Sequence, residues 1–504
     1  MSGQPFWRRG TIGDGPDAAV IDVGSNSVRL VVYRLEGRAM TPILNEKVMA
    51  GLGRGMGKER KLSPEGVEIA LRALRRYAIL VDSLGVKDVY PVATAAVRDA
   101  VDGHDFRKRV QRETGFKLRI LEGADEARLS ALGVQAGAPD AVGVVGDLGG
   151  ASLELIAIDE NGPGAGETFP LGPLSLAREG PFDLERVSKE INSALSRSQT
   201  LTKPGGDFYA VGGAWRAIGR IDIALRNHPI GVLHHHEMSR NEVLTVAELV
   251  RRQSKKSLEK LEEAAAKRAD TLPYAALALE RVMQVGAYRR VFLSAFGLRE
   301  GVLVERMNAE ALAQDPLIAA AEAMAGRSPY GVAYGRALET WVAPILSPQP
   351  AVFGDQRDAV LRGAAARLAN LGALLHPDQR VEVMFDLVLR APLAAISHPE
   401  RAFLAAAIHH RYAKATPKEA AYDRLLTDEM RKAAASLGSA LRLGCDLSGR
   451  CEPLLSQFAV AAEDGKLVLR INKDVGHLMT EQSAKRLEAA AQALGLSPQA
   501  ELVD

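Results

Sequence analysis

Two short glycine and serine turns, each opened by an aspartate and flanked by apolar runs, constrain this chain more than any other feature. The first turn reads Asp22-Val-Gly-Ser-Asn-Ser27, and the second reads Asp147-Leu-Gly-Gly-Ala-Ser152. Runs rich in β-branched residues lie on both sides of each turn, at 18–21 and 28–33 and at 142–145 and 153–158. Such runs predict strand, tight turn, strand. Two equivalent hairpins therefore predict two related lobes.

The chemistry of these turns fits an anion. Glycine admits an anion close to the backbone, and successive N–H groups in such turns form a concave site, to which serine and asparagine add side-chain donors. An aspartate at the end of a buried strand would repel that anion unless a cation or a water lay between them, as hard oxygen ligands hold Mg²⁺. The alternative for either turn alone is an ordinary β-hairpin. Because the pattern occurs twice, we expect a phosphate held from both sides.

Four motifs in the first 154 residues carry a resemblance to a known family. They are Asp22-Val-Gly-Ser-Asn-Ser-Val-Arg-Leu30, Ala93-Thr-Ala-Ala-Val-Arg98, Glu122-Gly-Ala-Asp-Glu-Ala127 and Asp147-Leu-Gly-Gly-Ala-Ser-Leu-Glu154. In order, spacing and content they resemble the exopolyphosphatase and guanosine pentaphosphate phosphohydrolase (Ppx/GppA) family. The resemblance covers about residues 17–303 well and the remainder more loosely.

The resemblance implies an α/β fold with two ribonuclease H-like lobes, as in the actin, sugar kinase and heat-shock chaperone superfamily. We expect the first lobe at 15–138 and the second at 139–312. A mainly helical domain, related to metal-dependent phosphohydrolases but degenerate, is expected at 313–436. A small α/β unit is expected at 437–504.

Local patterns place several candidate residues. Ser63 and Pro64 open a periodic helix to about residue 84, as N-cap and N1. A short strand at 89–93 delivers Thr94 and Arg98 to a helix start, where N–H groups and a guanidinium both meet phosphate oxygens. Arg98 is the candidate basic clamp, and its alternative is a solvated surface arginine.

The resemblance also implies site roles. Glu126, the glutamate before the alanine of the third motif, is the catalytic candidate that orients or deprotonates the attacking water. Its alternative is favourable charge against a helix dipole. Asp147 and Glu154 are the expected Mg²⁺ ligands. The expected substrate-binding residues are Asp22, Gly24, Ser25, Asn26, Ser27, Thr94, Arg98, Gly149, Gly150, Ala151, Ser152, Gly212 and Gly213.

This chain departs from the family pattern at three positions. Ala151 and Leu153 stand where the family usually has a third glycine and a threonine, and Ala214 stands where it usually has a threonine. The methyl group of Ala151 narrows the expected anion pocket. We expect catalysis to survive, because the remaining framework is intact, with a shift in preference among substrates.

Composition sets outer limits on class and partners. The 504 residues exceed one usual core, so several domains are expected. A net charge of +2 indicates no global attraction to nucleic acid, and two cysteines fit a reducing compartment. With no apolar stretch of 18 residues, we expect a cytoplasmic protein with no membrane partner.

Beyond about residue 305 the spacing predicts helices at 316–325, 356–375 and 399–412. The family's His-Asp metal pair is replaced by His376-Pro377, so His398, His409 and His410 lack the carboxylate of a two-metal site. Near the end, a strand at 467–471 and a helix at 480–494 are expected.

Three further stretches carry charge or histidine. Arg442, Arg450, Lys466, Arg470 and Lys473 form either a basic track for a long polyanion or, as the preferred alternative, a solvated face. His234 to His236 either bind a metal or, as the preferred alternative, lie in a loop. Residues 251–268 are expected to form a charged helix face.

The expected function is hydrolysis of the terminal phosphoanhydride of inorganic polyphosphate, with Mg²⁺ as cofactor. The alternative is a guanosine pentaphosphate 5′-phosphohydrolase, which binds the terminal phosphate in the same way. The sequence does not distinguish these two substrates. A catalytically weak alarmone-binding sensor and an ATP-dependent kinase are further alternatives; the retained Glu126 argues against the first. Family similarity implies a homodimer.

Overall fold

The computed structural model describes residues 17–56, 59–177, 182–202, 206–261, 266, 268–328 and 330–504. The chain divides into two compact units, Met1–Leu312 and Ala313–Asp504, each described by itself below. Residues 15 and 16, the expected start of the first lobe, lie outside the described part. The domain boundaries given above stay predictions.

The first sheet of the first unit has five strands in the order β3-β2-β1-β4-β5 within the described residues. Its strands are β1 (Asp17–Val23), β2 (Val28–Glu36), β3 (Ala39–Val48), β4 (Asp88–Ala93) and β5 (Arg119–Ile120). β1 and β2 form the predicted antiparallel hairpin, while β4 lies parallel to β1. The carboxyl ends of β1 and β4 therefore meet at one edge of the sheet, which is where Asp22 and Thr94 stand.

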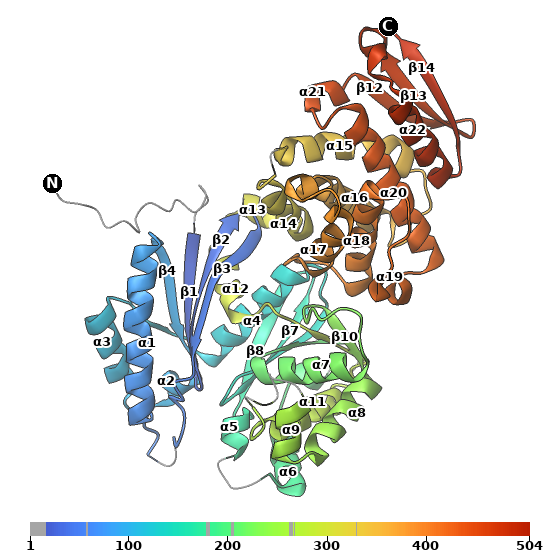
Figure 1. The fold of residues 1–504 in the computed structure, drawn as a ribbon. Coiled ribbons are helices and arrows are strands. Elements are labelled where there is room, and N and C mark those ends of the chain that lie inside the picture. Colours follow the sequence, from blue (N-terminus) through green and yellow to red (C-terminus); the bar gives the residue numbers. More distant parts are fainter. Residues whose placement is uncertain are drawn as a thin grey trace, which may run out of the picture. The chain divides into compact units, whose positions relative to one another are not determined.

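Alternating side chains of β1 build a core on each face of this sheet. Ala19 and Ile21 pack with α1 (Pro64–Ser83) and α3 (Gly103–Thr114), which lie together on one side in Figure 1. Ala18 and Val20 pack on the other face with residues of α4 (Gly123–Gly137) and α12 (Leu298–Val304). The predicted start of α1 is confirmed, since the Ser63 hydroxyl accepts a hydrogen bond from the Gly66 N–H over 3.2 Å.

The second sheet has the order β10-β11-β9-β6-β7-β8 within the described residues. Its strands are β6 (Gly143–Leu148), β7 (Leu153–Asp159), β8 (Gly162–Phe169), β9 (Asp207–Val211), β10 (His236–Ser239) and β11 (Arg290–Leu293). β6 and β7 form the second predicted hairpin, and β9 lies parallel to β6. The first sheet repeats this arrangement, with a hairpin followed by a parallel neighbour.

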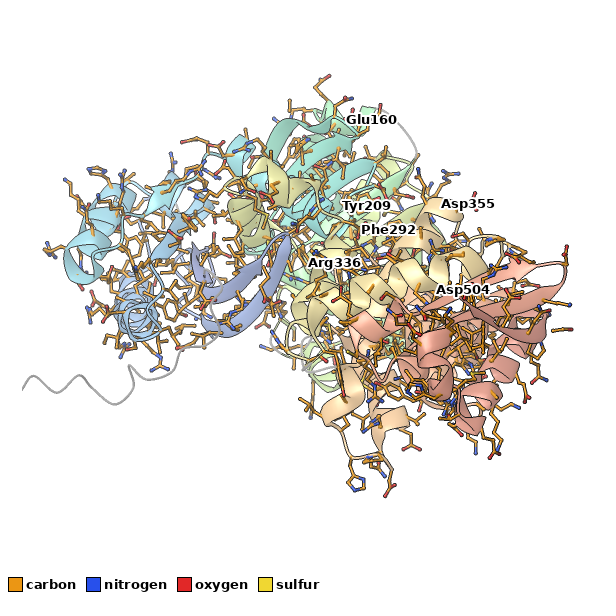
Figure 2. The ribbon with its side chains drawn as sticks, turned by 90° about the horizontal axis from the view of Figure 1, so that it is seen from above. Glu160, Tyr209, Phe292, Arg336, Asp355 and Asp504 are labelled. Carbon is orange, nitrogen blue, oxygen red and sulfur yellow. The ribbon has the colours of Figure 1, made fainter. Side chains whose placement is uncertain are left out.

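Helices cover both faces of the second sheet. One core contains residues of α6 (Leu184–Leu195), α7 (Gly213–Leu225), α8 (Arg240–Arg252) and α11 (Leu272–Val285). On the opposite face, α4 packs against Tyr209, which stacks on Phe292 at 5.5 Å between ring centres (Figure 2). Because α4 contributes to a core on each sheet, it lies between the two lobes. Shorter helices of this unit are α2 (Ala95–Asp99), α5 (Pro173–Leu176) and α9 (Lys255–Leu261).

The second unit is helical and ends in a small sheet. Its helices are α14 (Pro316–Ala325), α15 (Gly331–Leu346), α16 (Asp355–Leu368), α17 (Arg380–Arg390), α18 (His398–Tyr412), α19 (Ala420–Leu425), α20 (Asp428–Leu447), α21 (Glu452–Leu455) and α22 (Glu481–Leu494), and a short α13 (Ala309–Ala313) precedes them. Strands β12 (Phe458–Glu463), β13 (Lys466–Asn472) and β14 (Ser497–Val503) form a three-stranded sheet among the described residues. The helices and the strand expected here from the sequence are confirmed, with boundaries shifted by a few residues and the 356–375 helix ending at Leu368.

His398, His409 and His410, the histidines singled out in the sequence, are buried in this unit. Burial lowers the pKa of His409, and burial together with its neighbour His409 lowers the pKa of His410 to about 4. His409 also bonds through Nε2 to the Ala415 carbonyl at 2.9 Å. These imidazoles are neutral core groups near pH 7.

The basic residues near the C-terminus mostly have acidic or polar partners. Arg470 contacts both Glu463 and Glu501, and Lys473 contacts Asp504. Paired and exposed charges of this kind are typical of a solvated face, the alternative that the sequence favoured. Among the described helices, none combines the length and the apolar character needed to cross a bilayer.

Candidate functional site

The two predicted turns face each other across a cavity of about 410 Å³ in the first unit. Their backbones match: the Gly24 N–H donates to the Ser27 carbonyl, the Gly149 N–H donates to the Ser152 carbonyl, and both distances are 3.0 Å. A methyl group on Gly150 would lie 3.3 Å from the Ser25 Cβ, so the tips nearly touch. Of the predicted site residues, the following line this cavity: Asp22, Gly24, Ser25, Asn26, Ser27, Thr94, Glu126, Asp147, Gly149, Gly150, Ser152, Gly212 and Gly213.

Gly212 and Gly213 complete one wall of the cavity. Gly212 has a φ of 104°, and a Cβ there would lie 2.4 Å from the Leu148 carbonyl oxygen. Only glycine suits this backbone conformation at such a close approach. Gly212 therefore lets the end of β9 pack directly against the strand that carries the second turn.

Glu126 stands at the start of α4, between the two lobes, with its side chain buried. Burial first, and then the carboxylate of Asp147, raise the pKa of Glu126 to about 8, while Arg98 acts in the opposite direction. Asp147 accepts a hydrogen bond from the Ser130 hydroxyl over 2.5 Å, yet burial also raises its pKa. A carboxylate whose pKa is close to neutrality suits proton transfer.

Glu154 lies behind the cavity and does not line it. It is 1% exposed and stands opposite Asp147 in the β6 and β7 register. Its carboxylate oxygens are buried and make no well-formed hydrogen bond among the described residues. Burial, and then Glu126, raise its pKa well above the usual range.

This group of carboxylates fits a divalent cation. Asp22, Glu126 and Asp147 face the cavity, and Glu154 is buried beside them with only a weak contact to the Ser152 hydroxyl to favour its charged form. A buried charge without a partner is costly, and a hard cation supplies the missing positive charge through oxygen ligands.

Arg98 and Ala151, also predicted as substrate-binding residues, do not line this cavity. Both line a second cavity, of about 580 Å³, that adjoins the first. Arg98 donates to Glu126 through Nη1 over 3.2 Å and to Asp99 through Nε over 3.1 Å. The guanidinium of Arg98 is thus paired with the carboxylate of Glu126 and holds it in position. A contact between Arg98 and a phosphate would come on top of this role.

The sequence interpretation missed a basic wall of the first cavity. Its members are Arg29, Lys47, Arg216, Arg220, Arg268 and Arg299. Burial and the neighbouring Arg299 and Arg29 lower the pKa of Arg216 to about 10, and burial and Arg299 lower the pKa of Arg29. Like charges crowded in this way favour an anion between them.

Arg299 links this wall to the first turn. Its Nη1 donates to Oδ2 of Asp22 over 3.2 Å. The next residue, Glu300, fastens α12 to the first sheet by accepting from the Tyr33 hydroxyl over 2.5 Å. Arg29 and Arg299 follow Ser27 and Gly297 by two residues, so their closeness to glycine-rich turns was the available signal.

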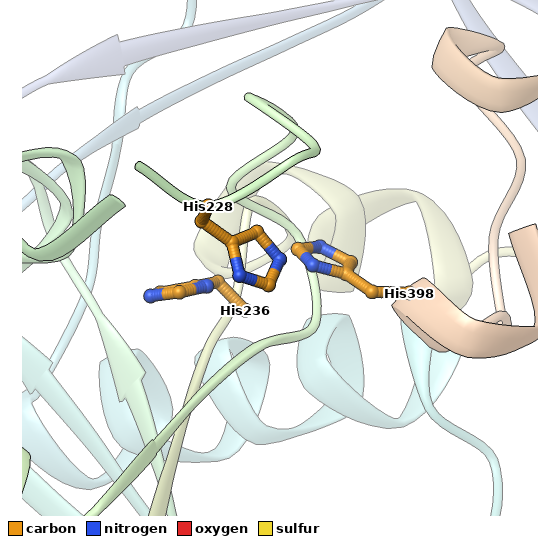
Figure 3. Close-up of side chains that lie close together, drawn as sticks. All are labelled: His228, His236 and His398. Atoms are coloured by element: carbon orange, nitrogen blue, oxygen red, sulfur yellow. The ribbon is translucent and has the colours of Figure 1, made fainter. Parts of the chain in front are cut away.

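The histidines at 234–236 lie outside this cavity. His236 begins β10 and bonds to Asp222 through Nε2 over 2.8 Å. Its ring meets that of His228 edge to face, with 5.1 Å between ring centres (Figure 3). His398, also labelled there, begins α18 of the second unit. Part of the 251–268 segment, residues 262–265 and 267, lies outside the described residues.

The two lobes, each with a hairpin beside a parallel strand, have the fold of the actin and sugar kinase type, which confirms the predicted fold class. A model of the Ppx/GppA phosphatase family matches residues 31–310 and a model of the exopolyphosphatase C-terminal region matches 317–501. The chain belongs to the Ppx/GppA phosphatase family. Its predicted enzyme class, a hydrolase of phosphoanhydride bonds, is confirmed.

Individual relatives agree with this assignment. Exopolyphosphatase 1 of Mycobacterium bovis is 28% identical over 305 residues, covering 58% of this chain and 88% of that protein. Exopolyphosphatase 1 of Mycobacterium leprae is 29% identical over 306 residues, covering 58% and 90%. Two solved structures share the fold: an Aquifex aeolicus Ppx/GppA family member (TM-score 0.52, 23% identity, 57% of this chain and 97% of that one) and an exopolyphosphatase from Cytophaga hutchinsonii (TM-score 0.54, 21% identity, 58% and 99%).

Proposed function

We propose that this enzyme hydrolyses the terminal phosphoanhydride of inorganic polyphosphate and releases orthophosphate. The observation that carries the proposal is the basic wall of six side chains, which faces the two matched turns across one cavity. The turns hold the end phosphate, and the basic wall holds the phosphates behind it. Phosphoryl transfer asks a protein chiefly for placement and charge stabilisation, and this arrangement supplies both.

Glu126 takes the part of the general base. Its Oε2 is held by Arg98, which leaves Oε1 for a water molecule. The water oxygen forms a bond to the terminal phosphorus while the bridging P–O bond breaks, and Glu126 receives the proton of the water. The backbone N–H groups of the turns stabilise the charge on the equatorial oxygens.

Asp22, Asp147 and Glu154 would hold the divalent cation, Mg²⁺ in our proposal. When bound, it supplies positive charge that screens the phosphate from these carboxylates. Burial raises the pKa values of Asp147 and Glu154 because it disfavours their charged forms, and a bound cation would supply the charge that stabilises the deprotonated carboxylates.

The lining of the cavity supports polyphosphate over guanosine pentaphosphate. No aromatic side chain is among its lining residues in the described part of the chain. A purine gains binding energy from stacking on such rings, whereas a polyanion gains from successive cations. The basic wall fits the polymer better than the nucleotide. The homodimer and the cytoplasmic location expected from the resemblance stay predictions.

Orthophosphate release from purified polyphosphate and from guanosine pentaphosphate, at equal phosphate concentration, tests the proposal. We expect kcat/KM to favour polyphosphate, and activity to require Mg²⁺ and to be lost with a chelator. Faster release from the nucleotide would assign the enzyme to the alternative substrate. Stoichiometric alarmone binding without turnover of either compound would support the sensor instead.

A further inference from the structure

The second cavity adjoins the first cavity, which contains Glu126, and shares part of its wall. Four residues line both cavities: Ser25, Ala95, Ser152 and Leu174. Two of these, Ser25 and Ser152, belong to the turns that face each other. The place where an end phosphate would sit is therefore bordered by two spaces, one on each side of the paired turns.

The two cavities differ in charge. The first is lined by six cations against the three carboxylates of Asp22, Glu126 and Asp147. The second has two cations, Arg60 and Arg98, and two carboxylates, Asp99 and Glu122. A chain of phosphates is retained best by the cationic space. The second cavity has no net charge, and the hydroxyls of Thr168 and Ser175 also line it. Such a cavity admits a hydrated phosphate but binds it weakly.

The outer wall of the second cavity lies at the protein surface. Arg60, Glu122, Ala124, Thr168 and Pro170 are all exposed and all line it. The inner end is marked by the 3.2 Å ion pair between Arg98, which lines the second cavity, and Glu126, which lines the first. The second cavity thus extends from the catalytic glutamate to solvent.

The geometry of phosphoryl transfer indicates on which side of the end phosphate the water and the leaving polymer lie. The attacking and leaving oxygens stand roughly in line on opposite sides of the phosphorus. The water is beside Glu126, so the leaving polymer lies away from Glu126, along the basic wall. After the bond is cut, the orthophosphate therefore lies between the remaining polymer in the first cavity and Arg98 in the second cavity.

We propose, on the basis of the function given above, that the second cavity is the exit for orthophosphate, so that the product leaves while the shortened polymer stays on the basic wall. Water enters by the same route. A long polymer then blocks departure through the first cavity. A short oligophosphate, which dissociates from the first cavity after one cleavage, does not depend on the second one.

Filling the outer part of the second cavity tests this. Ala124→Trp places a large side chain there, and Ala165→Trp, at an exposed position of β8 that lines neither cavity, is the matched control. Pro170→Trp narrows the same exit from a different element and serves if Ala124→Trp does not fold. Melting temperatures check that each variant is folded.

We expect Ala124→Trp to lower kcat on long polyphosphate by roughly tenfold, because product release becomes limiting, and to change kcat on tripolyphosphate little. Gels should show intermediate lengths accumulating, since the polymer dissociates before the next cut. An equal loss of kcat on both substrates would overturn the proposed exit. So would an unchanged kcat in both Ala124→Trp and Pro170→Trp relative to Ala165→Trp. A wild-type enzyme that releases no orthophosphate from any polyphosphate would instead overturn the proposed function.

Discussion

Gly150 and Ser25, one from each lobe, approach so closely that a methyl group on Gly150 would lie 3.3 Å from the Ser25 Cβ. The same methyl group would lie 3.2 Å from Cδ1 of Leu174. Both distances are tighter than ordinary van der Waals contact. The separation of the two turns, and with it the width of the phosphate site, therefore depends on the missing side chain at position 150.

Gly150→Ala is expected to push the turns apart and to lower kcat/KM on polyphosphate by roughly tenfold or more, since small misplacements of catalytic groups are costly. Steady-state orthophosphate release measures this. Gly164→Ala on β8, where the nearest atom would lie at 3.5 Å, is the control and should match wild type. Unchanged kinetics in Gly150→Ala would show that the turns do not set the width of the site.

Lys47→Ala and Arg220→Ala should weaken the grip on the polymer without harming the fold, because both residues are exposed members of the basic wall. We expect KM for long polyphosphate to rise and kcat to stay near wild type. The slope of log KM against log salt should fall by about one per variant, by analogy with phosphate contacts in nucleic-acid binding. Lys87→Ala, an exposed lysine outside the cavity, is the control, and equal slopes in all three variants would contradict the basic wall.

Stability without divalent cations should fall as pH rises from about 5 to about 8. The pKa of Glu126 is raised to about 8 in the folded state, so the folded protein keeps a proton that the unfolded chain has lost above about pH 4.3. The burial that raises the pKa values of Asp147 and Glu154 acts in the same direction. Melting temperatures measured with a chelator across this range check the sign.

Added Mg²⁺ should raise the melting temperature more at pH 8 than at pH 5, because it binds the deprotonated carboxylates and must displace protons at low pH. Glu154→Gln is the variant to compare, and its Mg²⁺ response should be smaller. An equal effect of Mg²⁺ at both pH values would contradict a cation site built from these carboxylates.

Local features were predictable from the sequence, because the residues that specify them are neighbours in the chain. The Asp22 and Asp147 hairpins and the Ser63 cap are of this kind. The basic wall was not predictable, since its members come from β2, β3, α7, α12 and the segment before α11 and meet only through tertiary packing. The helix start suggested a phosphate contact for Arg98, but its guanidinium forms ion pairs with Asp99 at 3.1 Å and with Glu126 at 3.2 Å.

Glu126→Gln tests the central claim most directly, namely that two lobes bring their turns to one phosphate beside this carboxylate. The amide keeps the size of the side chain and removes the base, so we expect the same fold by circular dichroism and a kcat on polyphosphate lower by roughly 10²–10⁴-fold. Turnover close to that of wild type in a folded Glu126→Gln enzyme would contradict the account.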